Sequence, residues 1–312
     1  MTAKIRTIFM GTPKFAVPGL QALLKSPDFN IVGVYTQPDK PVGRKQILTP
    51  PPIKALAVKN NIPIFQPKKI KTETENIKNL KPDLIVVIAY GQIIPQAILD
   101  IPQYGCINVH ASLLPKYRGA SCLAAPILNG DEKSGITIMK MDAGMDTGDI
   151  IKQISVKLSD KETLNSLHDR LSILGAEILT DTLKKYINGE IKTQKQDESK
   201  ASYVSLIKKE NGRLQVDLSA TALERKVRAY NPWPGAFLRL NNGEKIKIIE
   251  AQVEKAVHQG KIGEIYIKNG HLALNCGQDI LFILKLQREN RKVMNASDFL
   301  KGNQNILNLT AI

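Results

Sequence analysis

The sequence contains few cysteines, three in 312 residues, at positions 106, 122 and 276. They lie far apart, form no Cys-x-x-Cys pair, and belong to no Cys/His cluster with the spacing of a zinc site. A scaffold stapled by disulfides and a zinc-binding domain are therefore excluded. We expect three free, buried thiols in a reducing cytoplasm, and no metal site.

Long hydrophobic runs are also absent. No run approaches the roughly 20 apolar residues needed to cross a bilayer. Residues 1–10 carry basic side chains but no long apolar stretch and no cleavage site, so they predict a strand and not a signal peptide. With 43% hydrophobic and 23% charged residues, the composition is typical of a soluble globular protein. We expect a cytoplasmic protein that does not act in a membrane.

Acidic residues are scarce relative to basic ones, 29 against 44, which gives a net charge of +15. A surplus of this size favours a polyanionic partner, and nucleic acid is the first candidate. Residues 1–189 hold a net +8 and residues 190–312 a net +7. Charge alone therefore does not locate the partner, and a lysine-rich proteome is an alternative explanation of the surplus.

The first two-thirds of the chain alternates apolar runs with amphipathic segments. The apolar runs predict five strands, at residues 5–10, 31–35, 84–89, 106–110 and 135–141. The run 84–89 is apolar on both faces, as in a central strand of a parallel sheet. Amphipathic segments predict helices over 17–24, 53–59 and 163–186. This alternation predicts a doubly wound, Rossmann-like α/β domain over residues 1–189.

The pattern changes after a polar, charged stretch that predicts a linker over residues 190–205. A helix is predicted over 219–230, with Ser219 as its N-cap. Five short strands with Asn-Gly turns follow, at residues 237–240, 245–249, 263–267, 271–276 and 280–286. The segment 206–312 therefore favours a small, OB-like β-barrel domain.

Two polar residues, Asn108 and His110, lie where a predicted strand ends, which is where open α/β sheets place their sites. Because they are two apart, their side chains point to the same face of the strand. An amide and an imidazole there could hold a developing oxyanion, and the histidine could carry a proton. A carboxylate from the glycine- and aspartate-rich loop within 139–149 could orient the imidazole. Turn chemistry and a structural histidine explain the same residues without catalysis.

Longer motifs resemble one enzyme family. The run INVHASLLPKYRGAS at 107–121 and the run GITIMKMDAGMDTGDII at 135–151 are similar to methionyl-tRNA formyltransferases, and in part to other folate-dependent formyltransferases. Further similar segments are FMGTPKFAVPGL, YTQPDKPVGRKQ, KPDLIVVIAYGQIIP and RAYNPWPG. The similarity covers essentially the whole chain in the same order. One departure follows Ala120, where many relatives carry Ala-Pro and this chain has Ser121-Cys122, which we interpret as repacking near the pocket.

The resemblance implies the chemistry of the site. Asn108, His110 and Asp146 match the catalytic residues of the family. The folate-binding stretch corresponds to Ser112, Leu113, Leu114 and Pro115. The implied formyl donor is 10-formyltetrahydrofolate, and the implied acceptor is the α-amine of methionine on initiator tRNA. No metal takes part, and we expect a monomer.

The resemblance also implies residues that contact tRNA. The long loop over 35–50 matches the element that inserts into the acceptor arm, with Arg44 and Lys45 at its basic tip. Loops of this length without regular structure are often functional, and the composition suggests that order appears on RNA binding. Lys209 matches a lysine of the family. Further candidates for phosphate contacts are Lys208, Arg225, Lys226 and Arg228. A solvated surface is the alternative for each of these residues.

Three other functions compete with this interpretation. A formyltransferase for a sugar-nucleotide amine could share the catalytic residues, but the basic loop and the net charge speak against it. An inactive RNA-binding protein is disfavoured because the catalytic residues are intact. An oxidoreductase that uses a dinucleotide is disfavoured because Gly11-Thr12-Pro13 lacks the GxGxxG pattern.

Overall fold

The computed structural model describes residues 4–43, 45–257 and 260–312. The chain divides into two compact units, each formed from several segments. The first unit consists of Met1–Cys122, Lys133–Lys157 and His168–Val204, and the second of Leu123–Glu132, Leu158–Leu167 and Ser205–Ile312. Each unit has its own sheet, and the two are described separately.

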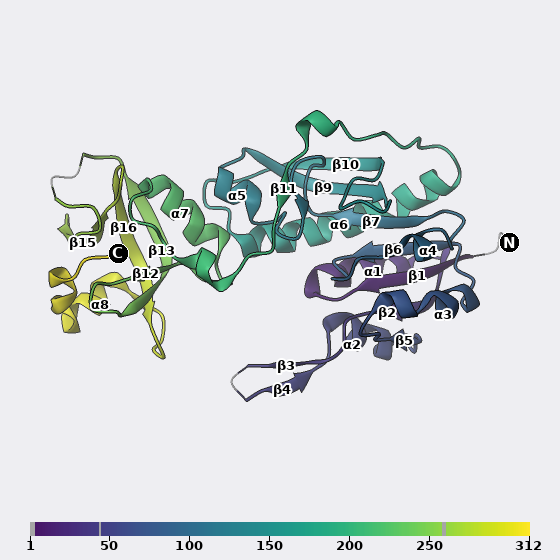
Figure 1. Cartoon of the computed structure of the whole chain (residues 1–312), viewed down its shortest axis with the longest axis horizontal. Helices are drawn as coiled ribbons and strands as arrows, with labels where there is room; N and C mark the ends of the chain where they lie inside the picture. Colours follow the sequence, from purple (N-terminus) through teal and green to yellow (C-terminus); the bar gives the residue numbers. More distant parts are fainter. Residues whose placement is uncertain (1–3, 44, 258–259) are drawn as a thin grey trace. The chain divides into compact units, whose positions relative to one another are not determined.

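A seven-stranded sheet forms the centre of the first unit, in the order β10-β9-β7-β6-β1-β2-β5 (Figure 1). Its strands are β1 (Ile5–Gly11), β2 (Phe29–Tyr35), β5 (Ile64–Phe65), β6 (Leu84–Ile88), β7 (Cys106–His110), β9 (Lys133–Lys140) and β10 (Ile150–Lys157). Five neighbouring strands pair in parallel: β7, β6, β1, β2 and β5. Strand β9 is antiparallel to both β7 and β10. The five strands predicted for this domain are confirmed, and the doubly wound α/β fold with them.

Helices cover both faces of this sheet. On one face lie α1 (Val17–Lys25) and α6 (Leu164–Ile187): a Cβ on Gly19 of α1 would overlap Ile88 of β6, and one on Gly175 of α6 would contact Val109 of β7. On the other face, α3 (Thr74–Asn79) and α4 (Gln96–Leu99) pack in the cluster that holds Cys106. The helix α2 (Pro52–Lys59) follows the hairpin described next. Both faces are covered, which explains why the central strands are apolar throughout.

The segment 35–50, expected to lack regular structure, instead forms a hairpin. Strand β3 (Lys40–Val42) pairs with β4 (Ile47–Thr49) in antiparallel register, and the pair projects from the first unit (Figure 1). The expectation was wrong because the proline and glycine content masked two short runs of residues that suit strands, with Val42 opposite Ile47. Arg44, predicted at the tip, lies outside the described residues.

The second unit is built on an antiparallel sheet, in the order β12-β13-β16-β15-β14, with β17 paired to β16. The strands are β12 (Phe237–Arg239), β13 (Lys245–Glu254), β14 (Ile265–Lys268), β15 (His271–Asn275), β16 (Ile280–Arg288) and β17 (Met294–Asn295). Thr310 bridges to Glu264 beside β14, and Ala311 bridges to Leu240 beside β12. These two bridges join the edges of the sheet through one segment, so the five predicted strands form a barrel-like layer.

Helix α7 (Ala220–Ala229) packs on this sheet through the face that the sequence predicts. Leu223 and Val227 are buried in the core of the unit. The Ser219 hydroxyl accepts a hydrogen bond from the Ala222 N–H at 3.2 Å, which confirms the predicted N-cap. The unit also contains the short α-helices α5 (Ala125–Asn129) and α8 (Ala296–Gly302).

The polar stretch expected as a linker contains a segment that pairs with the first unit. We call residues 194–204 the strap. At its start, Gln194 forms an antiparallel bridge with Ile150 at the beginning of β10. At its end, β11 (Tyr203–Val204) pairs in parallel with β8 (Arg118–Gly119). The strap therefore belongs structurally to the first unit.

Two glycines that follow helices give a prediction about stability. Gly130 after α5 and Gly189 after α6 both adopt left-handed backbone conformations, with φ of 69° and 75°. A Cβ at Gly189 meets no atom within 4 Å, whereas a Cβ at Gly130 would overlap the Arg225 guanidinium, which donates to the Asn129 carbonyl at 3.2 Å. Gly189→Ala should destabilise the protein by about 1 kcal/mol, from backbone strain alone.

Gly130→Ala should add about 1 kcal/mol more, because the guanidinium must leave its hydrogen bond. Chemical denaturation, followed for each variant against the parent, measures both effects. Equal losses of unfolding free energy in the two variants would show that the Arg225 contact does not contribute to stability.

Candidate active site

The three predicted catalytic side chains meet at the end of β7. Cys106, Asn108 and His110 are spaced two residues apart on this strand, so their side chains point to the same face. Asp146 comes from the loop between β9 and β10. Its Oδ1 lies 3.4 Å from the Asn108 Nδ2, which donates to it, and its Oδ2 lies 3.6 Å from the His110 Nδ1. The structure thus brings together three residues that are up to 38 positions apart in sequence.

The conformation of Asp146 is unusual and depends on its neighbours. Its φ is 55°, in the left-handed region that a residue with a Cβ rarely adopts. The Gly119 N–H donates to its Oδ2 at 2.7 Å. Two positions later, a Cβ on Gly148 would overlap the Lys140 carbonyl, so only glycine lets the loop approach β9 this closely. The loop holds a strained aspartate with its carboxylate facing His110.

His110 is 6% exposed and is surrounded by groups that favour its charged form. Its Nε2 lies 3.1 Å from the Tyr117 carbonyl, and because a carbonyl only accepts, this nitrogen carries a proton. Burial acts to lower the pKa of His110. The hydrogen-bonded Cys122 side chain, the Asp146 carboxylate and the Tyr117 carbonyl outweigh burial and raise the pKa to about 9. At neutral pH the ring is therefore a cation beside the Asn108 amide.

The stretch after β7 that the resemblance assigns to folate forms a tight, internally bonded turn. Ser112 is fully buried, and its hydroxyl donates to the Lys116 carbonyl at 2.6 Å. Leu114 is buried, and its N–H donates to the Thr137 hydroxyl at 3.1 Å. Leu113 and Pro115 are half-buried, so they are the apolar side chains of this stretch that remain accessible.

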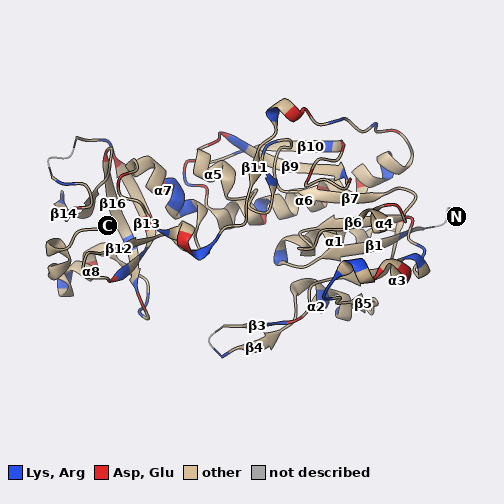
Figure 2. Cartoon of the chain, viewed as in Figure 1, with Lys and Arg blue, Asp and Glu red and all other residues tan. Residues whose placement is uncertain are grey.

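The predicted tRNA contacts lie in both units. Lys45 is exposed beside the turn of the β3–β4 hairpin, and Arg44 lies outside the described residues. Lys209 begins a short 3-10 helix, Lys209–Gly212, in the second unit. Lysines and arginines are spread over both units (Figure 2).

Lys209 belongs to a group of cations in the second unit, the other three of which lie on the neighbouring strands β12 and β13. Burial and the nearby positive charges of Lys247, Lys209 and Arg239 lower the pKa of Lys245. We call Lys209, Arg239, Lys245 and Lys247 the basic cluster. The three strand residues of this cluster were not predicted as tRNA contacts from the sequence. A signal for two of them was present, because Lys245 and Lys247 alternate with the buried Ile246 and Ile248, which places both lysines on one face of the strand.

Three of the other basic residues considered for phosphate contacts form hydrogen bonds within the second unit. Arg228 forms two hydrogen bonds to Glu224, at 2.6 and 2.9 Å, and a third to the Glu162 carbonyl. Lys226 donates to the Arg213 carbonyl at 2.7 Å, and Arg225 to the Asn129 carbonyl. These side chains stabilise the unit, which makes them weaker candidates than the basic cluster.

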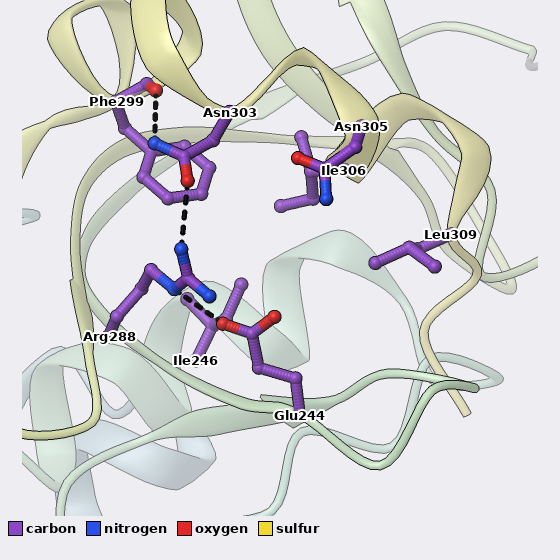
Figure 3. Close-up of a pocket in the computed structure, with 8 residues that line it drawn as sticks. All are labelled: Glu244, Ile246, Arg288, Phe299, Asn303, Asn305, Ile306 and Leu309. Carbon is purple, nitrogen blue, oxygen red and sulfur yellow. Dashed lines mark hydrogen bonds and ion pairs between the residues drawn. The ribbon is translucent and has the colours of Figure 1, made fainter.

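A pocket in the second unit does not offer a site for a folate. It has room for about one water molecule. Figure 3 shows that the polar groups along it bind one another: Arg288 donates to Glu244 at 2.5 Å and to Asn303 at 2.8 Å. The remaining lining residues are Ile246, Phe299, Asn305, Ile306 and Leu309.

Two features are absent from the described part of the chain. Within residues 4–43, 45–257 and 260–312, no three or more His, Cys, Asp and Glu side chains gather where they could hold a metal ion. No helix in these ranges combines the length and the apolar character needed to cross a membrane.

Comparison with known proteins assigns the family. The family model for formyl transferase matches residues 3–183, and that for the formyl transferase C-terminal domain matches residues 206–304. A methionyl-tRNA formyltransferase of Geobacter sulfurreducens is 44% identical over 303 residues, covering 96% of this chain and 94% of its own length. One from Bacillus velezensis is 43% identical over 301 residues, covering 95% and 94%. The chain belongs to the methionyl-tRNA formyltransferase family.

Solved structures of other formyltransferases share the fold of this family member. WlaRD, a sugar 3N-formyl transferase determined with dTDP and 5-N-formyl-THF, superimposes with a TM-score of 0.66 at 22% identity, covering 93% of this chain and all of its own. An N-formyltransferase from Helicobacter canadensis, in complex with folinic acid and dTDP-3-aminofucose, gives 0.67 at 21% identity, covering 89% and 99%. At these identities the likeness establishes the fold alone.

The environment of His110 predicts its titration. Its ring should titrate near pH 9, and Cys122→Ala should lower this midpoint, because burial stays while one group that favours the cation is lost. The protonated ring therefore stabilises the folded protein fully below the ordinary pKa of 6.5, and this stability is lost as the pH rises through about 9.

NMR titration of the histidine Cε1 protons measures the midpoint, and His110→Gln identifies the resonance. Cys276→Ala, which removes a buried thiol of the second unit, is the control and should leave the midpoint unchanged. A parent midpoint at or below 6.5 would contradict the charged state of the ring.

Proposed function

We propose that this member of the family transfers a formyl group from 10-formyltetrahydrofolate to the α-amine of methionine on initiator tRNA, in the cytoplasm and as a monomer. The observation that carries the proposal is the meeting of Asn108, His110 and Asp146 at the end of β7, in a chain that matches methionyl-tRNA formyltransferases along 96% of its length.

The three side chains divide the chemistry of acyl transfer. A bond forms between the amine nitrogen and the formyl carbon, and the bond between that carbon and the folate nitrogen breaks. The Asn108 amide and the charged His110 ring stabilise the negative charge that develops on the formyl oxygen. Asp146 holds the charged ring and accepts the proton that the attacking nitrogen loses, directly or through water. The departing folate nitrogen takes up a proton in turn, which regenerates the carboxylate. No step needs a metal ion.

The accessible apolar side chains after β7 support the assignment of the donor substrate to this stretch. Leu113 and Pro115 offer accessible apolar side chains for the flat ring of a folate, next to the polar trio. The buried contacts of Ser112 and Leu114 hold the turn that presents them. We assign this stretch to folate binding.

The acceptor substrate distinguishes this proposal from a sugar formyltransferase. We assign Arg44 and Lys45 of the segment 35–50, together with Lys209 in the basic cluster, to contacts with tRNA. A phosphate backbone is bound through several cations at once, and four cations on neighbouring elements of the second unit suit that task. We accordingly assign residues 1–189 to catalysis, 190–205 to the connection, and 206–312 to tRNA binding.

The catalytic assignment predicts the effect of two substitutions. Asn108→Ala should lower the rate of formylation by about 10²–10³-fold, because it removes one donor to the oxyanion. Asp146→Ala should be at least as severe, because it also removes the proton acceptor. The assay incubates the pure protein with 10-formyltetrahydrofolate and methionyl-initiator tRNA and measures formyl-methionine after hydrolysis.

Asp160→Ala, at an exposed aspartate, is the matched control and should retain the parent rate. A parent protein that binds tRNA but forms no product would favour a binding-only protein. A parent that neither binds tRNA nor forms product would make a sugar-nucleotide amine the next acceptor to test. Full activity of Asp146→Ala would disprove the assignment of the site.

The assignment of Lys209 predicts a change in salt dependence. Lys209→Ala should weaken binding of initiator tRNA and reduce the slope of log affinity against log salt concentration by about one, since one phosphate contact is lost. Fluorescence anisotropy over a series of salt concentrations measures the slope. Lys301→Ala is the control, because the Lys301 ammonium is paired with Asp298 at 2.9 Å. Identical slopes for Lys209→Ala and the parent would remove Lys209 from the interface.

A further inference from the structure

The side chain of Gln196, on the strap, lies between a buried arginine and the loop of Asp146. Its Nε2 donates to the main-chain carbonyls of Asp146 and Gly148, at 2.8 and 2.7 Å. Its Oε1 accepts from Arg118 Nε and Nη2, at 3.1 and 2.9 Å. Both donors and both acceptor positions of the amide are therefore used. Its orientation is fixed because the carbonyls can only accept hydrogen bonds and the guanidinium can only donate them.

Arg118, which orients this amide, is itself fully constrained. Its side chain is completely buried, yet all five of its N–H groups donate. Beyond the two bonds to Gln196, it binds the Glu198 carboxylate at 2.6 and 2.8 Å and the Tyr203 hydroxyl at 2.8 Å. All of these partners are strap residues. Movement of the strap away from Arg118 would therefore break all five of these hydrogen bonds at once, which is unfavourable.

The same strap supports both neighbours of Arg118, and these contact the candidate site. The Ser202 hydroxyl accepts from the Tyr117 N–H at 2.9 Å, and the Tyr117 carbonyl binds His110. Gly119, paired with Val204, donates to the Asp146 carboxylate. Gln196 holds the main chain of Asp146, so this aspartate is held at both its carboxylate and its carbonyl.

We propose that Gln196 is a positioning residue, which holds the main chain of Asp146 so that its carboxylate faces Asn108 and His110. The inference rests on the proposed function of this site. Asp146 has a left-handed backbone, which is unfavourable for a residue with a Cβ and persists only where the surroundings impose it. Two hydrogen bonds from one amide to the carbonyls of Asp146 and Gly148 impose that conformation. Gln196 thereby gives the polar strap a role in the candidate site as well as a connection to the second unit.

Two substitutions separate this role from simple docking of the strap. Gln196→Met removes all four hydrogen bonds. Gln196→Glu keeps an oxygen for Arg118 but places another oxygen against the carbonyls of Asp146 and Gly148. If Gln196 positions Asp146, both variants should lower kcat by about 10- to 100-fold, because small misplacements of a reacting group have effects of that size. If Gln196 only docks the strap on Arg118, Gln196→Glu should restore activity.

Gln194→Glu is the matched control. Gln194 lies two residues earlier in the strap, its side chain is exposed, and its main chain forms the bonds to Ile150. The same change of charge there should leave kcat at the parent value. KM for the tRNA should change by less than about twofold in Gln196→Glu, because the substitution acts on positioning and leaves uniform binding intact. Thermal melting confirms that each variant is folded.

A double-mutant cycle and an NMR titration decide whether Gln196 acts through Asp146. In single-turnover reactions, Gln196→Glu should add less than about a twofold loss to Asp146→Ala, since there is no carboxylate left to position. The His110 midpoint, which needs no turnover, should fall in Gln196→Met as the Asp146 carboxylate moves away, because this variant removes the hydrogen bonds without adding a charge. Gln194→Met, the corresponding change at the exposed position, should leave that midpoint unchanged.

Three outcomes would count against the inference. Equal losses from Gln196→Glu with and without the Asp146 carboxylate would overturn it, as would an unchanged kcat together with an unchanged His110 midpoint. Full activity of Asp146→Ala would overturn the proposed site as well, and so separates failure of the function from failure of the positioning role.

Discussion

A guanidinium buried inside the first unit is the interaction on which the candidate site depends. An unpaired charge in the interior would be unfavourable by several kcal/mol. Arg118 avoids this because all five of its N–H groups are bonded, two of them to the carboxylate of Glu198, which is 67% exposed and keeps much of its contact with water. The residues on either side of Arg118 bind His110 and Asp146. The hydrogen bonds that hold the guanidinium in place therefore also hold the two side chains of the candidate site.

The fold of both units could be predicted because it follows from local patterns. A run such as Leu84–Ile88 is apolar on both faces and has one natural place, in the middle of a covered sheet. The edge strand Ile150–Lys157 was missed because only one of its eight residues is fully buried, which leaves a weak apolar pattern. The hairpin within 35–50 was missed for a related reason: its strands are three residues long and exposed, so cross-strand pairing forms them without a buried face.

The site was only partly predictable from residue spacing. Alternation along a strand places Asn108 and His110 on one face, and the structure has them so. Nothing in the spacing brings Asp146 to them, because its approach depends on a left-handed backbone and on a hydrogen bond from Gly119, 27 residues away. Asp146 was predicted only from the family resemblance. The strap was harder still to predict. Its polar sequence is typical of a linker, and its partners elsewhere in the first unit lie 44 to 87 residues away in sequence.

The charge state of His110 shows how buried polar groups here depend on one another. Burial opposes a cation, so the ring stays charged only while its partners remain in place. The Tyr117 carbonyl and the Asp146 carboxylate are held by the strap, directly or through Gly119. The third partner is the Cys122 side chain, whose hydrogen bond and charge also raise the pKa of the ring. A change far from the ring, in a segment with no catalytic group, therefore alters the chemistry through the pKa of one side chain.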